Sequence, residues 1–240
     1  MSSAPSSIHR FDWRGFLLVG GIAFVGAISF QGSRGIFQTT EGRYAECARE
    51  TMASGDYDDP ILNGQPHWTK PPLTYVAIMG GIRAFGRSPW GVRAYLFPAL
   101  VLAALAVWLA GTFIWGAPTG FWAGLVFATS PFVVGAANVV SSDLLTTLWV
   151  ALAFAAFWHG HARHSPLSIL AMWVFLGRGF LTKGPPALLI PAACLPLAGI
   201  RLRAFLPAGV AYVADSARMV RFRVVETNEF VETVSDGFGT

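Results

Sequence analysis

A run of 49 consecutive residues, from Ala94 to Ser142, contains no Asp, Glu, Lys or Arg. An α-helix rises about 1.5 Å per residue and the apolar core of a bilayer is about 30 Å thick, so this run is long enough for two crossings. Over all 240 residues only 12% are charged and 54% are hydrophobic, whereas soluble domains carry about 25% charged residues. The sequence therefore predicts an all-α protein that passes through a membrane several times.

Six apolar stretches are expected to cross. The first, Gly15 to Ser33, could also be read as a cleaved signal peptide, because Ala27 and Ser29 fit a small-residue cleavage site. The number of later spans favours a retained helix. The other five spans are expected at residues 92–114, 119–140, 144–160, 166–182 and 185–200.

Six crossings define a topology and a division of the chain. They place residues 1–14 in the cytoplasm, followed by a transmembrane domain at 15–203 and a divergent polar tail at 204–240. The positive-inside rule supports this orientation only weakly, because the first outer loop, at about 34–91, is also rich in Lys and Arg.

The outer loop is predicted to contain an amphipathic helix at residues 41–57. Four of its residues fall on one apolar stripe and the opposite face is charged, which suits a helix in the membrane interface; the stripe consists of Tyr44, Cys47, Ala48 and Met52. A second apolar stretch, at 73–86, is too short and too interrupted by glycine to be assigned as a span.

Two lysines stand beside proline pairs at the edges of apolar segments. Lys70 precedes Pro71 and Pro72, which fix φ and exclude Lys70 from a helix interior. Lys183 occupies a similar place in "LTKGPP". A fixed cation at the membrane surface suits phosphate binding, whereas basic residues at helix ends can also simply extend to the interface. The second interpretation is assigned to Arg83, Arg87 and Arg93.

Four segments together resemble a known family: "TTEGRYAECARETMASGDYDDPILNGQPHWTKPPLTY", "FGRSPWGVRAY", "SSDLLTTLW" and "LTKGPPALLIP". In this order they are similar to the bacterial polyprenyl-phosphate-sugar transferases of GT-C fold, which include the aminoarabinose transferases and the protein O-mannosyltransferases. The resemblance extends from about Gly15 to Arg203. After Arg203 the sequence no longer resembles the family, which suggests a truncated or frame-altered product.

The resemblance implies a glycosyltransferase of the bacterial plasma (inner) membrane. Its donor would be a polyprenyl-phosphate-linked sugar bound from within the membrane. Its acceptor would be a hydroxyl group of a lipid, a glycan or a protein on the extracytoplasmic face, as in lipopolysaccharide or protein glycosylation. Transfer would invert the anomeric carbon. Nucleic acid is not expected as a partner, since the net charge of +4 is modest and no basic face is evident.

The resemblance also implies site residues. Arg43 and Lys70 match the family's cations at the donor phosphate, and Lys183 is added to them from its own sequence context. The family's acidic pair falls on Thr40 and Glu41, so the first acid is missing. Threonine is no base at neutral pH, which leaves Glu41 and Asp143 as catalytic candidates. Each could instead serve a helix N-terminus, Glu41 as a first-turn acid and Asp143 as a cap.

Ring-bearing side chains near Lys70 are the candidates for sugar binding: Tyr44, His67, Trp68 and Tyr75. Aromatic residues at this depth can equally be membrane anchors. No cofactor is expected to be required. Many aminoarabinose transferases have a metal-binding glutamate before the lysine, but Thr69 stands there in this chain, so a divalent metal is not supported.

Two other functions are compatible with the sequence. The same cations could belong to a small transporter or flippase of an anionic lipid, and Arg178, within an apolar segment, suits that reading. Alternatively, Thr40 and the divergent tail suit an inactive truncated membrane protein. The sequence identifies neither the sugar nor the acceptor nor the oligomeric state.

Overall fold

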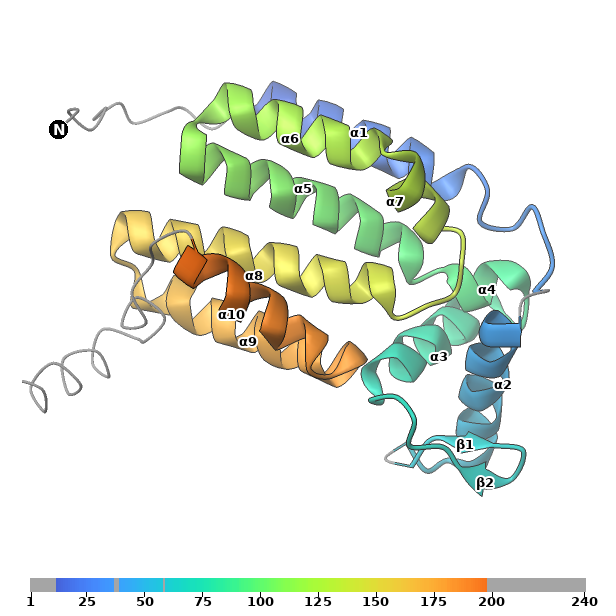
Figure 1. Ribbon diagram of the computed structural model, residues 1–240. Coiled ribbons are helices and arrows are strands. Elements are labelled where there is room, and N and C mark those ends of the chain that lie inside the picture. Colours follow the sequence, from blue (N-terminus) through green and yellow to red (C-terminus); the bar gives the residue numbers. More distant parts are fainter. Residues whose placement is uncertain (1–11, 37–38, 58, 198–240) are drawn as a thin grey trace, which may run out of the picture. The chain divides into compact units, whose positions relative to one another are not determined.

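The computed structural model describes residues 12–36, 39–57 and 59–197 (Figure 1). Nearly all of its regular structure is helical, as predicted. The elements are α1 (Trp13–Ile28), α2 (Thr39–Ser54), β1 (Ile61–Leu62), β2 (Gln65–Pro66), α3 (Leu73–Phe85), α4 (Pro89–Arg93), α5 (Leu96–Trp115), α6 (Ala117–Thr129), α7 (Pro131–Ala136), α8 (Asp143–Arg163), α9 (Pro166–Lys183) and α10 (Pro186–Leu197).

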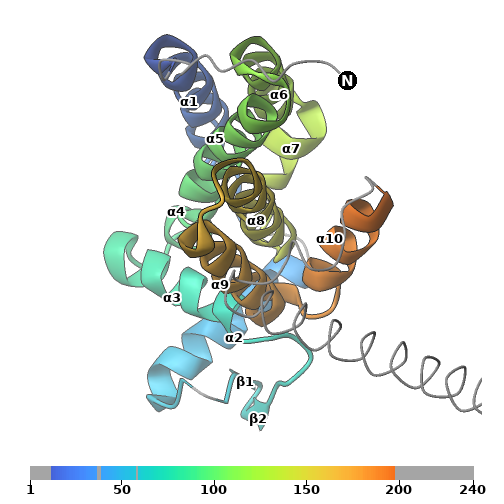
Figure 2. The same ribbon diagram turned by 90° about the vertical axis from the view of Figure 1, so that its left-hand side faces the viewer.

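Five long helices pack side by side. Helix α5 contacts α1, α6 and α8, and α8 also packs along α9. Figure 2 views these helices nearly end-on. Large apolar side chains face outward on these helices, among them Leu17, Trp122 and Leu170. An apolar outer surface on a helix bundle is what a lipid environment favours.

Glycine allows α5 and α6 to approach closely. A Cβ atom added to Gly120 of α6 would lie 2.6 Å from the carbonyl oxygen of Trp108 in α5, and one added to Gly124 would lie 2.8 Å from the Trp108 Cβ. Such separations are too short for any side chain. Trp108 itself is buried at this contact, with 1% of the residue exposed.

Helices α2, α3 and α4 and the β1–β2 hairpin lie together at one end of the long helices (Figure 1). The stripe predicted for α2 is confirmed: Tyr44, Cys47 and Ala48 are buried in the core, and Met52 packs against it. Helix α3 coincides with the apolar stretch expected at 73–86. Between α2 and α3, the hairpin turns at Asn63 and Gly64, which have φ of 54° and 71°, as tight hairpin turns require.

Each predicted span contains a helix, but one span is interrupted. The span expected at 119–140 is broken at Ser130, after which α7 starts at Pro131. Within the described residues, two segments are both long and apolar enough to cross a membrane, Pro89–Trp115 and Asp143–Arg163, and the apolar helices α1 and α3 are shorter. The count of six crossings therefore stays a prediction. Residues 1–11 and the tail at 204–240 lie outside the described residues.

Candidate functional site

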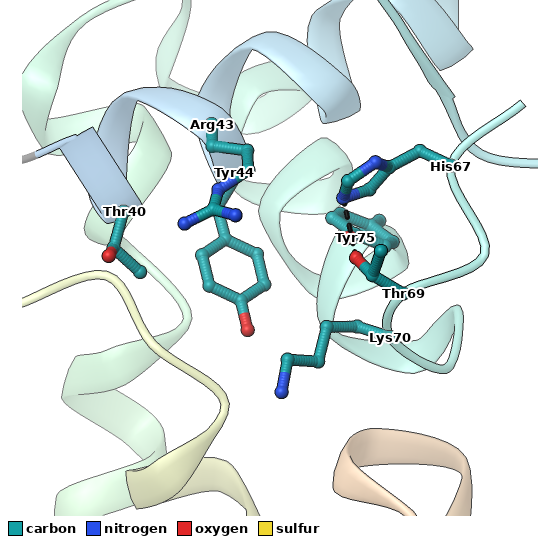
Figure 3. Close-up of a pocket in the computed structure, with 7 residues that line it drawn as sticks. All are labelled: Thr40, Arg43, Tyr44, His67, Thr69, Lys70 and Tyr75. Atoms are coloured by element: carbon teal, nitrogen blue, oxygen red, sulfur yellow. Dashed lines mark hydrogen bonds between the residues drawn. The ribbon is translucent and has the colours of Figure 1, made fainter. Parts of the chain in front are cut away.

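A pocket lies between the first turns of α2 and the segment that joins the hairpin to α3 (Figure 3). It holds about 300 Å³ of empty space, part of it open to solvent. Seven residues line it: Thr40, Arg43, Tyr44, His67, Thr69, Lys70 and Tyr75. Five of them are residues that the sequence analysis assigned to the donor phosphate or to the sugar.

The two cations of the pocket come from separate elements. Arg43 is carried by α2, one turn after its start, whereas Lys70 precedes Pro71 and Pro72 immediately before α3. Lys70 lies outside any helix, as the proline pair requires. Among the described residues that line the pocket none is an Asp or a Glu. The charge presented to a ligand is therefore positive.

Aromatic rings and hydroxyl groups form the rest of the lining. The rings of Tyr44 and Tyr75 lie 5.6 Å apart between centroids. His67 Nε2 and Thr69 Oγ1 are 2.6 Å apart, within hydrogen-bonding distance. Trp68, between them in sequence, does not line the pocket; it is 73% exposed and its indole N–H donates to Asp59.

Glu41 lies next to the pocket-lining Thr40 but is fully buried outside the pocket. Its carboxylate accepts two hydrogen bonds from the guanidinium group of Arg34, at 2.9 and 3.2 Å. It accepts two more from Arg93, at 3.2 and 3.1 Å. The backbone N–H of Val140 donates a further bond of 2.8 Å. Both carboxylate oxygens thus have several donors.

This environment sets the protonation of Glu41. Burial by itself raises the pKa of the carboxyl group, but the hydrogen bonds from Arg93, Val140 and Arg34 outweigh it, and the pKa is lowered from its ordinary value. Glu41 is consequently held as a carboxylate whose lone pairs are occupied. A carboxylate of this kind is suited to holding its neighbours in place and unsuited to accepting a proton.

The assignment of Arg93 to a surface position is wrong. Its side chain is 0% exposed, and besides Glu41 it donates to the carbonyl oxygens of Gln31, Arg34 and Gly35. A guanidinium group has five N–H donors in a planar fork, which suits such a multiply bonded buried place. The interface interpretation also missed Arg34, which shares Glu41 with Arg93.

Asp143 and Lys183 form an ion pair with each other, between the first residue of α8 and the last of α9. Neither lines the pocket of Arg43 and Lys70. Asp143 does not cap α8, whose N-cap position belongs to Ser142. The end of α9 still lies near the pocket, because the Thr74 hydroxyl of α3 donates to the Thr182 carbonyl at 3.2 Å.

Within the described part of the chain, no group of three or more His, Cys, Asp and Glu side chains is placed to hold a metal ion. The pocket itself offers one imidazole and hydroxyl groups beside two cations, a combination that divalent metals disfavour.

Comparisons with known proteins identify relatives of this chain. Residues 69–215 match the family described as dolichyl-phosphate-mannose-protein mannosyltransferase. An undecaprenyl phosphate-alpha-4-amino-4-deoxy-L-arabinose arabinosyl transferase of Edwardsiella ictaluri is 37% identical over 167 residues, which are 67% of this chain and 30% of that protein. A protein of the same name from Pseudomonas savastanoi pv. phaseolicola is 33% identical over 67% of this chain and 31% of its own length.

Among solved structures, ArnT from Cupriavidus metallidurans bound to undecaprenyl phosphate superposes with a TM-score of 0.68 and 26% identity, covering 76% of this chain and 34% of that one. The chain thus spans about a third of the length of these relatives. The family match covers more than half of the chain, and the resemblance to polyprenyl-phosphate-sugar transferases of GT-C fold is confirmed. This chain belongs to the dolichyl-phosphate-mannose-protein mannosyltransferase family.

Proposed function

We propose that this chain provides the donor-binding part of a glycosyltransferase that moves a sugar from a polyprenyl phosphate to an acceptor hydroxyl group. One observation carries the proposal: Arg43 and Lys70, from segments far apart in sequence, line one pocket that presents no carboxylate among its described residues. The names of the relatives, with undecaprenyl phosphate as carrier, support the same donor class.

The chemistry follows from the charges. When the bond from the anomeric carbon to the phosphate oxygen breaks, negative charge develops on the phosphate. Two cations already in place stabilise that charge without reorganising during the reaction. Attack by the acceptor from the face opposite the phosphate would invert the anomeric carbon. Tyr44 and Tyr75 offer ring faces and hydroxyl groups for the sugar.

The proposal includes a location. The bundle would cross the bacterial plasma membrane several times, with the pocket at the extracytoplasmic surface, where a lipid-linked donor can reach it from the bilayer. The exposed Trp68, on the same segment as Lys70, suits the membrane interface. The acceptor would be a lipid, a glycan or a protein that carries a free hydroxyl group.

The test is sugar transfer by the purified chain in lipid nanodiscs, with an undecaprenyl-phosphate-linked sugar as donor. The rate is measured as the release of undecaprenyl phosphate. Lys70→Ala should lower the rate at least 10-fold, because a charge-assisted hydrogen bond contributes about 1.5–3 kcal/mol. Arg87→Ala removes an exposed cation from the α3–α4 connection and serves as the matched control. Exchange of labelled lipid between leaflets without release of sugar would contradict the proposal and favour a flippase.

A further inference from the structure

Among the described residues that line the pocket, none carries a side-chain carboxylate that could take a proton. A hydroxyl group that attacks an anomeric carbon must lose its proton, and a positioned base accelerates such a step about 10²- to 10⁴-fold. Glu41 is saturated by Arg34, Arg93 and the Val140 N–H, and Asp143 is paired with Lys183. Neither carboxylate lines the pocket. Another acceptor of the proton is needed.

Thr69 and His67 offer such an acceptor. Both line the pocket, and Nε2 of the imidazole lies 2.6 Å from the threonine Oγ1 (Figure 3). The backbone of His67 is fixed by its N–H, which donates to the carbonyl oxygen of Pro60 at 2.6 Å. Pro71 and Pro72 restrict the chain just beyond Thr69. The pair is therefore held between a hairpin and a rigid turn, beside Lys70.

We propose that Thr69 and His67 form a proton relay for the acceptor hydroxyl group, an inference that rests on the proposed function. The acceptor oxygen forms its bond to the anomeric carbon while the bond from that carbon to the phosphate oxygen breaks. The acceptor proton passes to Thr69 Oγ1, and the threonine proton passes to His67 Nε2. The electron pair of the broken bond stays on the phosphate, which faces Arg43 and Lys70.

The relay requires one tautomer. His67 must be neutral with its proton on Nδ1, so that Nε2 accepts from the threonine. The charged and titratable groups that share the pocket with the imidazole are Arg43, Tyr44, Lys70 and Tyr75.

A spectroscopic experiment tests the relay without relying on turnover. The chain is labelled with ¹⁵N-histidine, and the signals of His67 are identified by their loss in His67→Gln. At pH 8 the relay predicts an unprotonated Nε2 whose chemical shift moves in Thr69→Val, which removes the hydroxyl group, but little in Thr69→Ser, which retains it. A protonated Nε2 at pH 8, or a shift equal in both variants, would overturn the relay.

Kinetic measurements provide a second test of the relay. Thr69→Val and His67→Gln should lower kcat about 100-fold or more, while Thr69→Ser, which retains the hydroxyl group, should retain most of the activity. Binding of undecaprenyl phosphate should change less than about threefold in all three. Wild-type kcat in His67→Gln with normal donor binding would overturn the relay and leave the proposed function standing. Failure of the unmodified chain to bind undecaprenyl phosphate would overturn the proposed function, whereas the NMR result would still decide the tautomer.

Discussion

Arg93 donates from Nε to Oε1 of Glu41 at 3.2 Å and from Nη2 to Oε2 at 3.1 Å, and neither side chain is exposed to solvent. The two residues are 52 positions apart, so this pair joins α4 to the first turn of α2. Thr40, Arg43 and Tyr44 enter the pocket from the same turns. The buried ion pair therefore holds in place the turns of α2 that supply three of the seven pocket residues.

Removing one partner of this pair should destabilise the protein strongly. Arg93→Ala leaves Glu41 with Arg34 and the Val140 N–H as donors and creates an empty buried site. Breaking a buried ion pair in this way costs about 3–5 kcal/mol. The melting temperature in detergent should fall well below that of Arg87→Ala, in which an exposed arginine is lost. Equal melting temperatures for the two variants would show that the pair is not structural.

The lowered pKa of Glu41 predicts a pH dependence of stability. A carboxyl group whose pKa is lower in the folded state contributes stability above its unfolded pKa, near 4.5, and that contribution is lost as the pH falls through the folded pKa. The melting temperature of the wild type should therefore drop below about pH 4.5 more steeply than that of Glu41→Gln. Glu46, whose side chain is 40% exposed and whose pKa is also lowered by Arg49, provides the control. Because solvent weakens this partly exposed pair, Glu46→Gln should change the acid-side drop much less than Glu41→Gln.

The close contact of α5 and α6 predicts different effects for two glycine substitutions. In Gly120→Ala the new methyl group meets Thr112 and the Trp108 carbonyl, so the melting temperature should fall. In Gly135→Ala of α7 the new Cβ has nothing within 4 Å, and the helix should gain up to about 1 kcal/mol. A Gly120→Ala variant as stable as Gly135→Ala would contradict the observed helix packing.

Asp143→Asn separates the relay from a carboxylate base. Because the Asp143 and Lys183 side chains are 58% and 33% exposed, their pair should contribute no more than about 1 kcal/mol to stability. If Thr69 and His67 transfer the proton, sugar transfer in Asp143→Asn should stay within about 10-fold of the wild type. A loss as large as that of Thr69→Val would instead identify Asp143 as the base.

Much of the helical architecture could be predicted because hydropathy reports burial directly. The chargeless run from Ala94 to Ser142 contains α5, α6 and α7, and the stripe of Tyr44, Cys47 and Ala48 is the buried face of α2. The meeting of Arg43 and Lys70 was also predictable, because a family motif links them. The backbone conformation of Lys70 could be predicted as well, because Pro71 and Pro72 follow it directly before α3.

The partners of individual charges were not predictable. Nothing local distinguishes Arg93 from Arg87, yet one is fully buried and the other exposed, because only the fold brings Glu41 to Arg93. One signal was present: Arg93 is the last charged residue before the chargeless run, where a basic side chain needs an acidic partner. Similarly, Lys183 meets Asp143 across two helix ends that lie 40 residues apart.

The most direct test of the donor site is a double-mutant cycle on binding of undecaprenyl phosphate, with the wild type, Arg43→Ala, Lys70→Ala and the double variant in nanodiscs. Both cations should contact one phosphate, so each single substitution is predicted to weaken binding about 10- to 100-fold. The double variant should lose less than the product of the two factors. Affinities equal to that of Arg87→Ala in both single variants would contradict the account.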